Sequence, residues 1–130
     1  MDNCPFCQLA NDNSNRIVAT NELAFAMRDG YPLVPGHTLI IPKRHEGSFF
    51  KLLPVEQTAL LELLALLKAD LNRTMGIDDF NIGINDGPSA GQTVPHCHIH
   101  LIPRRLGDMP DPLGGVRWIF PDKADYWSQP

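Results

Sequence analysis

The chain has 130 residues, which is enough for one domain and too short for two ordinary ones. Its 43% hydrophobic and 20% charged residues lie near globular averages and exclude a disordered or fibrous protein. The 11 Lys and Arg residues against 15 Asp and Glu give a net charge of -4, which argues against binding a DNA or RNA polymer but not a single nucleotide.

The cysteines are few and odd in number, at Cys4, Cys7 and Cys97. Because the N-terminus also lacks the basic and apolar segments of a secretion leader, we expect a reducing cytoplasm rather than a secreted disulfide framework. No stretch of about 18 uncharged apolar residues is present, so we expect no membrane span.

The first half of the chain reads as short strands. Apolar runs at residues 16–19 and 23–27 flank a polar turn and predict a hairpin. Residues 31–36 are too rich in Pro and Gly for regular structure, and residues 37–41 then read as a buried strand that Pro42 stops.

A long helix is predicted over residues 54–75, with Pro54 in its first turn and Gly76 after its end. Two leucines, Leu63 and Leu66, widen its apolar stripe beyond one face, and such a helix needs two covers. One cover is the sheet; the other is a second subunit, giving a homodimer, or alternatively the C-terminal tail. The stripe itself consists of Leu60, Leu64, Leu67 and Leu71.

The second half returns to strands. Apolar and polar residues alternate over residues 80–84, a loop covers 86–91, and residues 96–102 form the last clear strand. From about residue 106 the tail looks irregular. Strands, one long helix and further strands predict an α+β fold with an antiparallel sheet, in a single domain over residues 1–130.

Three histidines alternate within the last strand. Side chains two apart share a face, so His96, His98 and His100 point to one side. The other side receives the apolar residues of a core: Cys97, Ile99 and Leu101.

Two chemistries fit three imidazoles on one face. They could hold a catalytic metal whose bound water is the nucleophile, or one neutral imidazole could attack an electrophile directly. The metal site wants carboxylates close in sequence, and none is present. Covalent catalysis wants a loop that holds an anion beside the strand, and residues 85–93, rich in Gly and small polar residues, offer one.

Residues 86–104, DGPSAGQTVPHCHIHLIPR, resemble the signature of the histidine triad (HIT) superfamily. Residues 34–45, VPGHTLIIPKRH, are similar to its other characteristic segment, and the resemblance covers about residues 4–105. Residues 91–94 and 103–104 look most like the dinucleoside polyphosphate hydrolase (fragile histidine triad-like) branch. The resemblance implies an antiparallel sheet of about five strands with one long helix and a short one.

The resemblance also implies an enzyme. It would hydrolyse dinucleoside polyphosphates, such as diadenosine tetra- or triphosphate, or nucleoside phosphoramidates at the α-phosphorus. His98 would form a covalent nucleotidyl-histidine, while His100 and His37 would contact the phosphate oxygens.

Further residues would bind the substrate. Asp29 matches a position that bonds the ribose hydroxyls, and an adenine base would lie between apolar side chains. The phosphate and leaving-group positions are Asn85, Gln92 and Thr93, and the base positions are Phe6, Leu9, Met27 and Leu39.

The pair Cys4 and Cys7, spaced as CxxC, is half of a zinc site. The resemblance implies that His45 and His96 complete it, so that the zinc is structural. A redox dithiol and two plain thiols at an N-terminal strand are the alternatives. A divalent cation could also accompany the substrate.

Two other functions remain open. A binding module that senses adenine nucleotides would turn over little substrate, and it would not need His98. A nucleotidyl transferase is the second, although that branch has Pro where this chain has Cys97.

Overall fold

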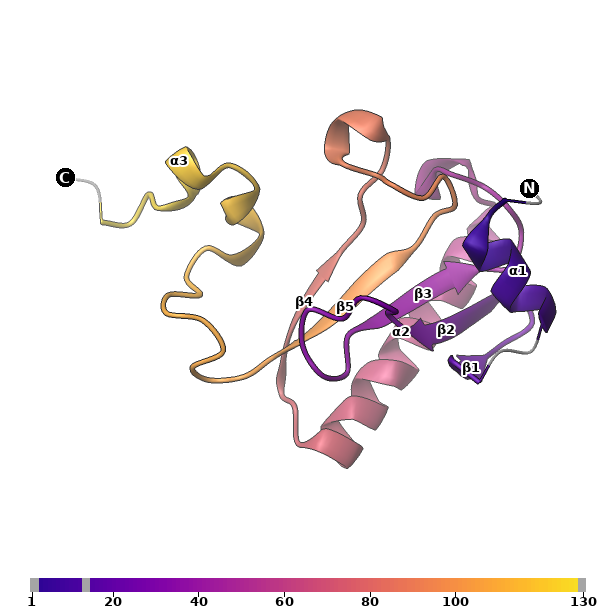
Figure 1. The fold of residues 1–130 in the computed structure, drawn as a ribbon, viewed down its shortest axis with the longest axis horizontal. Helices are drawn as coiled ribbons and strands as arrows, with labels where there is room; N and C mark the ends of the chain where they lie inside the picture. Colours follow the sequence, from indigo (N-terminus) through magenta and orange to yellow (C-terminus); the bar gives the residue numbers. More distant parts are fainter. Residues whose placement is uncertain (1–2, 13–14, 129–130) are drawn as a thin grey trace.

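Five antiparallel strands form one sheet in the order β1-β2-β3-β5-β4 in the computed structural model, which describes residues 3–12 and 15–128 (Figure 1). The predicted α+β class, with an antiparallel sheet of about five strands, is confirmed. The strands are β1 Ile17–Thr20, β2 Ala24–Arg28, β3 Thr38–Pro42, β4 Asp79–Gly83 and β5 Ile99–Arg104.

The long helix α2 spans Pro54–Met75, as the sequence predicts. Pro54 occupies the first helical position, where a missing amide hydrogen is not needed, and a Glu56 carboxylate oxygen accepts the amide of Leu53 at 2.8 Å. Gly76 ends the helix at φ 69°, a left-handed conformation that favours glycine.

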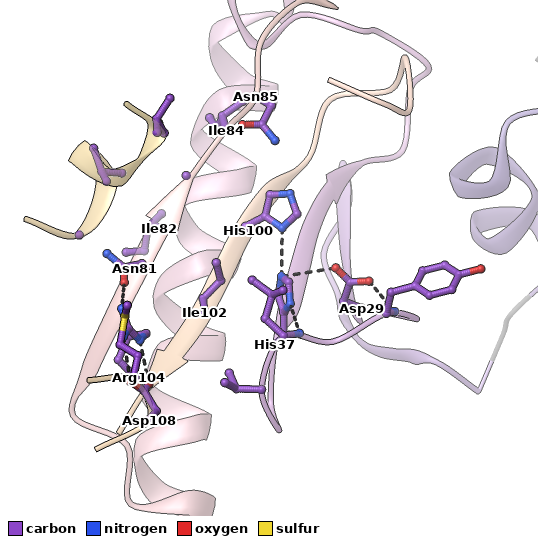
Figure 2. Close-up of a pocket in the computed structure, with 18 residues that line it drawn as sticks. Asp29, His37, Asn81, Ile82, Ile84, Asn85, His100, Ile102, Arg104 and Asp108 are labelled. Carbon is purple, nitrogen blue, oxygen red and sulfur yellow. Dashed lines mark hydrogen bonds and ion pairs between the residues drawn. The ribbon is translucent and has the colours of Figure 1, made fainter. Parts of the chain in front are cut away.

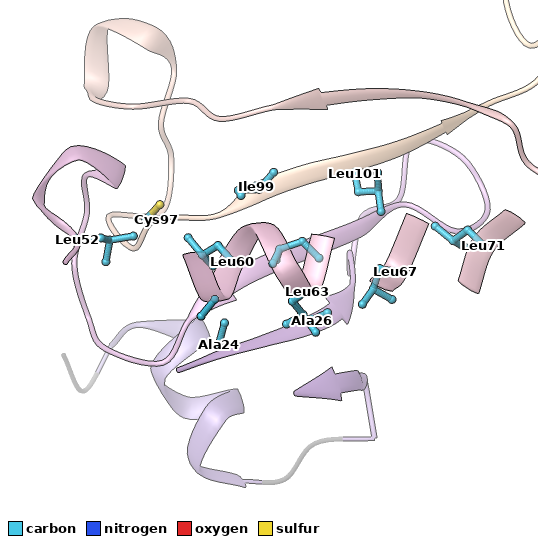
Figure 3. Close-up of a cluster of buried hydrophobic side chains, with 12 residues drawn as sticks. Ala24, Ala26, Leu52, Leu60, Leu63, Leu67, Leu71, Cys97, Ile99 and Leu101 are labelled. Carbon is cyan, nitrogen blue, oxygen red and sulfur yellow. The ribbon is translucent and has the colours of Figure 1, made fainter. Parts of the chain in front are cut away.

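One face of α2 packs on one face of the sheet (Figure 3). Leu63 is 2% exposed and belongs to this core, Leu64 is only half-buried, and Leu66 is 56% exposed. Leu64 nevertheless packs against this core, so all four residues of the expected stripe contact it, and Leu63 joins them. The buried leucines are Leu60, Leu63, Leu67 and Leu71, and their partners in the sheet include Ala24, Ala26, Ile40, Ile99 and Leu101.

The opposite face of the sheet carries a second apolar cluster under the short helix α1, Pro5–Asp12. Residues of β2 and β3 alternate between the two clusters, so both strands are covered on both faces. The CxxC pair thus lies at the start of a helix and not on the N-terminal strand that one alternative assumed. The second cluster comprises Cys4, Phe6, Phe25, Met27, Leu39 and Ile41.

The last strand starts later than the sequence suggests, at Ile99 rather than His96. Continuing the β3–β5 register would bring Cys97 opposite Pro42, which has no amide hydrogen to donate. The Cys97 amide instead donates to the Glu46 carbonyl at 2.7 Å. The residues directly before Ile99 lie outside the ladder, and Cys97 still faces the α2 core.

The connections hold two short 3-10 turns, η1 Phe49–Lys51 and η2 Pro88–Ala90. Beyond β5 the tail contains the 3-10 turn η3, Gly115–Ile119, and the four-residue helix α3, Pro121–Ala124. In Figure 1 this tail runs back alongside β4, on the edge of the sheet. Within the described part of the chain, no helix has the length and hydropathy that crossing a bilayer requires.

Candidate functional site

The sequence-predicted histidines meet on the face of the sheet away from α2. Leu39 of β3 pairs with His100 of β5, and alternation along β3 places His37 on the same side as Leu39. Figure 2 shows the His37 and His100 rings facing each other, with Asp29 beside them. His98 lies two residues before His100, and the two ring centroids are 5.1 Å apart.

A backbone carbonyl fixes the orientation of His98. Its Nδ1 lies 2.8 Å from the carbonyl oxygen of His96, and because a carbonyl only accepts, Nδ1 carries the proton. In the neutral ring Nε2 then holds the free lone pair. Phe6 of α1 packs edge-on against the ring with centroids 5.0 Å apart, so α1 also limits the ring's rotation.

A second chain of hydrogen bonds orders His37 and His100. The amide of Leu33 donates to His37 Nδ1 at 3.1 Å, so His37 carries its proton on Nε2. That nitrogen donates to His100 Nδ1 at 3.0 Å. His100 must then carry its own proton on Nε2, where it is available as a donor to a negatively charged oxygen.

Burial keeps both of these rings neutral. Desolvation lowers the pKa of His37, and the nearby Asp29 carboxylate opposes this only in part. Desolvation, with the neighbouring His98 and His37, lowers the pKa of His100 to about 4. At pH 7 each ring therefore has one donor and one acceptor nitrogen, as the hydrogen-bond chain requires.

Asp29 lies next to the histidines rather than apart from them. One carboxylate oxygen is 3.4 Å from His37 Nε2, and the other accepts the Tyr31 amide at 2.8 Å. The carboxylate is 15% exposed and so remains accessible to a ligand. The structure brings Asp29 to the site, and the ribose contact stays a prediction.

The three predicted substrate-binding residues in the loop after β4 differ in exposure and in hydrogen bonding. Asn85 and Thr93 are exposed. Gln92 is instead committed to the backbone: it accepts the amide of Gly87 at 2.8 Å and donates to the carbonyls of Gly47 and Val94 at 2.9 and 3.1 Å. Gln92 thus shapes the loop, and its expected substrate contact stays a prediction.

The four predicted base-binding residues gather where α1 packs on the sheet. Three of them are buried in the second apolar cluster and Leu9 packs against it from α1. They lie on the same face as the histidines, which is where a nucleoside would have to be. The three buried members are Phe6, Met27 and Leu39.

Two cysteines and two histidines form a compact cluster of metal-ligand atoms. Their four ligand atoms lie within 4.8 Å of one another. Cys7 Sγ is 3.3 Å from His45 Nδ1, and His96 Nδ1 is 3.4 Å from Cys4 Sγ and 3.5 Å from Cys7 Sγ. Tetrahedral Zn²⁺, with bonds of about 2.3 Å to sulfur and about 2.0 Å to nitrogen, places neighbouring ligand atoms roughly 3.5 Å apart.

The protonation of His96 also suits a metal ligand. Its Nε2 donates to the Pro42 carbonyl at 2.8 Å, which leaves Nδ1 with a lone pair directed at the sulfurs. Burial lowers the pKa of His96 and so keeps the ring neutral. In the metal-free protein, burial and the adjacent Cys4 raise the pKa of the Cys7 thiol, and a dication at this point would reverse that.

A cavity of about 640 Å³ adjoins the histidines and is lined by His37, His100, Asp29 and Asn85 among others. The remaining walls of the cavity were not predicted from the sequence. They come from outward-facing residues of β4 and β5 and from the tail beyond residue 106, such as Ile82, Ile102, Met109, Val116 and Ile119. Single apolar residues in an irregular tail form no periodic pattern, so their place in the cavity wall could not be predicted from the sequence.

Comparison with known proteins gives consistent results. The HIT domain family matches residues 10–107. The asymmetrical bis(5'-nucleosyl)-tetraphosphatase of Schizosaccharomyces pombe is 36% identical over 94 residues, which cover 72% of this chain and 52% of that protein. A bis(5'-adenosyl)-triphosphatase of Saccharomyces cerevisiae is 31% identical over 116 residues, covering 88% and 53%. The chain thus spans about half the length of the curated relatives it matches.

Among solved structures, a Zn-bound histidine triad family protein from Mycobacterium smegmatis superposes with a TM-score of 0.77. It is 30% identical, and the match covers 85% of this chain and 81% of that one.

The lowered histidine pKa values predict an acid-sensitive fold. Between pH 6.5 and about 4 the unfolded chain binds a proton at residue 100 that the folded protein excludes. The free energy of unfolding should therefore fall as the pH decreases through this window, by about 2 kcal/mol from His100 after allowance for solvent screening. His37 adds to the loss, since its pKa is lowered too.

Urea unfolding at pH 7 and at pH 4.5 measures the effect. His100→Gln keeps a polar side chain that does not titrate, so its stability should change less between the two pH values than that of the wild type. An equal change in both proteins would contradict the assignment.

Proposed function

The chain belongs to the HIT domain family, and we propose that it is a nucleotide hydrolase that cleaves at the α-phosphorus through a covalent nucleotidyl-His98. The observation that carries the proposal is the His98 ring, whose Nδ1 donates to the His96 carbonyl and leaves Nε2 as the nucleophile. A sensing module would have no use for a nitrogen prepared in this way.

The first step forms a bond between His98 Nε2 and the α-phosphorus. The bond from phosphorus to the bridging oxygen breaks, and the leaving phosphate takes the electron pair. Positive charge then develops on the imidazole, where the His96 carbonyl 2.8 Å from Nδ1 stabilises it.

The second step releases the nucleotide. Water attacks the same phosphorus, the P–N bond breaks, and its electron pair returns to His98 as the nucleoside monophosphate leaves. His100 would donate from Nε2 to a phosphate oxygen in both steps. His37 acts on the phosphate indirectly, through its hydrogen bond to His100, because its own donor nitrogen is directed at His100.

Replacing the nucleophile tests this mechanism. His98→Ala should lower kcat by at least about 10³-fold while the product nucleotide still binds, because the ring contributes chemistry rather than most of the affinity. In the wild type, rapid quench and peptide mass spectrometry should find an acid-labile nucleotidyl group on the peptide that contains His98. Turnover within tenfold of wild type, or an adduct elsewhere, would exclude the covalent mechanism.

We propose dinucleoside polyphosphates as the preferred substrates and adenosine phosphoramidates as the second class. Two of the relatives described above bear names of enzymes that split dinucleoside polyphosphates. The cavity beside His100 provides room for a large leaving group, which a phosphoramidate does not have. A divalent cation bound to the polyphosphate would offset its charge, because Arg104 is already paired with Asp108.

A substrate panel tests this preference. We expect kcat/KM for diadenosine tetra- or triphosphate to exceed that for an adenosine phosphoramidate when both are assayed under the same conditions. A phosphoramidate cleaved at least about tenfold more efficiently would reverse the assignment and leave the chemistry of His98 intact. Loss of turnover with every substrate, with tight binding kept, would favour the sensing module.

We propose a structural zinc ion held by Cys4, Cys7, His45 and His96. It would join α1 to the segment after β3 and to the histidine segment, and it would take no part in the reaction. The ligand spacing, the lone pair of His96 Nδ1 and the zinc-bound relative support the site. Since both cysteines must be reduced to bind zinc, a reducing cytoplasm is the compartment we propose.

Metal analysis tests the site independently of activity. Untagged protein should contain one zinc per chain, and Cys4→Ser should lose it and lower Tm, because binding contributes to folding. Cys97→Ala is the matched control: Cys97 lies in the α2 core and should leave the zinc content unchanged. No zinc after refolding with the metal would disprove the site and favour two plain thiols.

We propose that the protein is a homodimer through α2. The argument now rests on Leu61 and Leu66, which are both more than half exposed, since Leu63 belongs to the monomer core. Exposed leucines on one helix invite a second copy.

Sedimentation at micromolar concentration should give a species of about twice the 14.5 kDa chain mass. Leu66→Glu should convert the dimer to the monomer. Lys68→Gln is the control, because Lys68 lies on the same helix and is already polar, and this change should leave the dimer intact. A single 14.5 kDa wild-type species would refute the dimer.

A further inference from the structure

Residues 46–49, which follow β3, form a brace: they bond to two segments that lie far away in the sequence. The carbonyl of Glu46 accepts the amide of Cys97, in the histidine segment, at 2.7 Å. The carbonyl of Gly47 accepts the side-chain amide of Gln92, near the end of the loop after β4, at 2.9 Å. One short segment therefore sets how the loop and the histidine segment lie relative to each other.

The start of the same loop is tied to the brace by the side chain of Asp86. Its Oδ1 accepts the Phe49 amide at 2.8 Å, and its Oδ2 accepts the Ser48 hydroxyl at 3.0 Å. Ser48 Oγ in turn accepts the Phe50 amide at 3.2 Å, so its single hydrogen is free to be directed at Asp86. Both carboxylate oxygens are thus used, and hydrogen bonds to a charged acceptor are stronger than those between neutral groups.

The loop is also closed on itself between these two anchors. Gln92 Oε1 accepts the Gly87 amide at 2.8 Å, and the Gly87 carbonyl accepts the backbone amide of Gln92 at 3.2 Å. The anchoring residues Asp86 and Gln92 are the sequence neighbours of Asn85 and Thr93, which are the exposed residues predicted to contact the phosphate or the leaving group. Each predicted contact therefore lies one residue from an anchor.

The negative charge of Asp86 opposes the binding of a polyphosphate at this loop. Asn85, which directly precedes it, lines the cavity together with His100, so a phosphate bound there would lie near the Asp86 carboxylate. The repulsion is offset if the two bonds to the brace place the loop better for the transition state. Asp86 thus has a use that its charge alone would not suggest.

We propose that Asp86 is a positioning residue that acts through Asn85: it fixes the loop on the brace, so that the Asn85 side chain is in place before the phosphate arrives. The inference rests on the proposed function and adds a residue to it. Donors placed in advance stabilise developing charge without rearranging, and a misplacement of about 1 Å can lower a rate on the order of 100-fold. Loss of Asp86 should therefore lower kcat more than it raises KM.

Single and double variants test whether Asp86 acts through Asn85, with whichever of the proposed substrates the wild type cleaves best. Asp86→Ala should lower kcat by about 10- to 100-fold and change KM by less than about threefold. Asp86→Asn keeps an oxygen that can accept the Phe49 amide, so its kcat should stay within about threefold of wild type. In an Asn85→Ala background, Asp86→Ala should lower kcat by less than about a further threefold, because the residue through which it acts is already gone.

Asp79→Ala is the matched control, because it makes the same change at an exposed carboxylate at the other end of β4. It should leave kcat and KM unchanged. Ser48→Ala removes one of the two donors to Asp86 and should give a smaller loss of kcat of the same kind. Thermal unfolding shows that each variant is folded, and Ser48→Ala takes the place of Asp86→Ala in the double variant if the latter does not fold.

Equal losses of kcat from Asp86→Ala with and without Asn85 would overturn the inference, since Asp86 would then act independently. A kcat for Asp86→Asn as low as that for Asp86→Ala would also overturn it, because charge rather than placement would then matter. So would a kcat within threefold of wild type in both Asp86→Ala and Ser48→Ala. A wild-type protein that cleaves none of the proposed substrates would instead overturn the proposed function, and the inference with it.

Discussion

Backbone groups decide which nitrogen of each histidine carries a proton, and the site depends on this constraint. The carbonyls of His96 and Pro42 can only accept, and the amide of Leu33 can only donate. His98 is thereby left with a free lone pair toward the substrate, and His96 with one toward the cysteines. Carbonyls at the end of β3 and just before β5 thus give two similar side chains, His96 and His98, different roles.

The early end of the β3–β5 ladder is what frees those carbonyls. Had the strand begun at His96, as the sequence suggested, the carbonyls of Pro42 and His96 would have been candidates for pairing across the ladder. Pro42 interrupts that pairing, and the imidazoles take the place of amide donors. The same departure joins the proposed metal site to the reaction, because the residue that faces the sulfurs also supplies the acceptor for His98.

Features set by local sequence patterns could be predicted from the sequence, whereas features set by contacts between distant segments of the chain could not. Alternation placed Cys97 in the core, and Pro54 and Gly76 bounded the long helix, because these signals act within a few residues. Leu63 was expected at a subunit interface but is buried in the core of the single chain. Helical spacing alone does not say which side of the helix faces the sheet. The contact of Gln92 with a ligand stays a prediction, whereas its three backbone partners were not foreseen, because they depend on a loop that no short-range rule describes.

The division between a tightly packed sheet and a separately ordered tail has a consequence for divergence among relatives. Substitutions at Leu67 or Ile99 must preserve a close-packed core, so few can be tolerated there. Residues such as Val116 and Ile119 are largely exposed and lie outside the matched domain, so they can vary with little loss of stability. Selection can therefore alter the tail freely while the histidine chemistry is inherited unchanged.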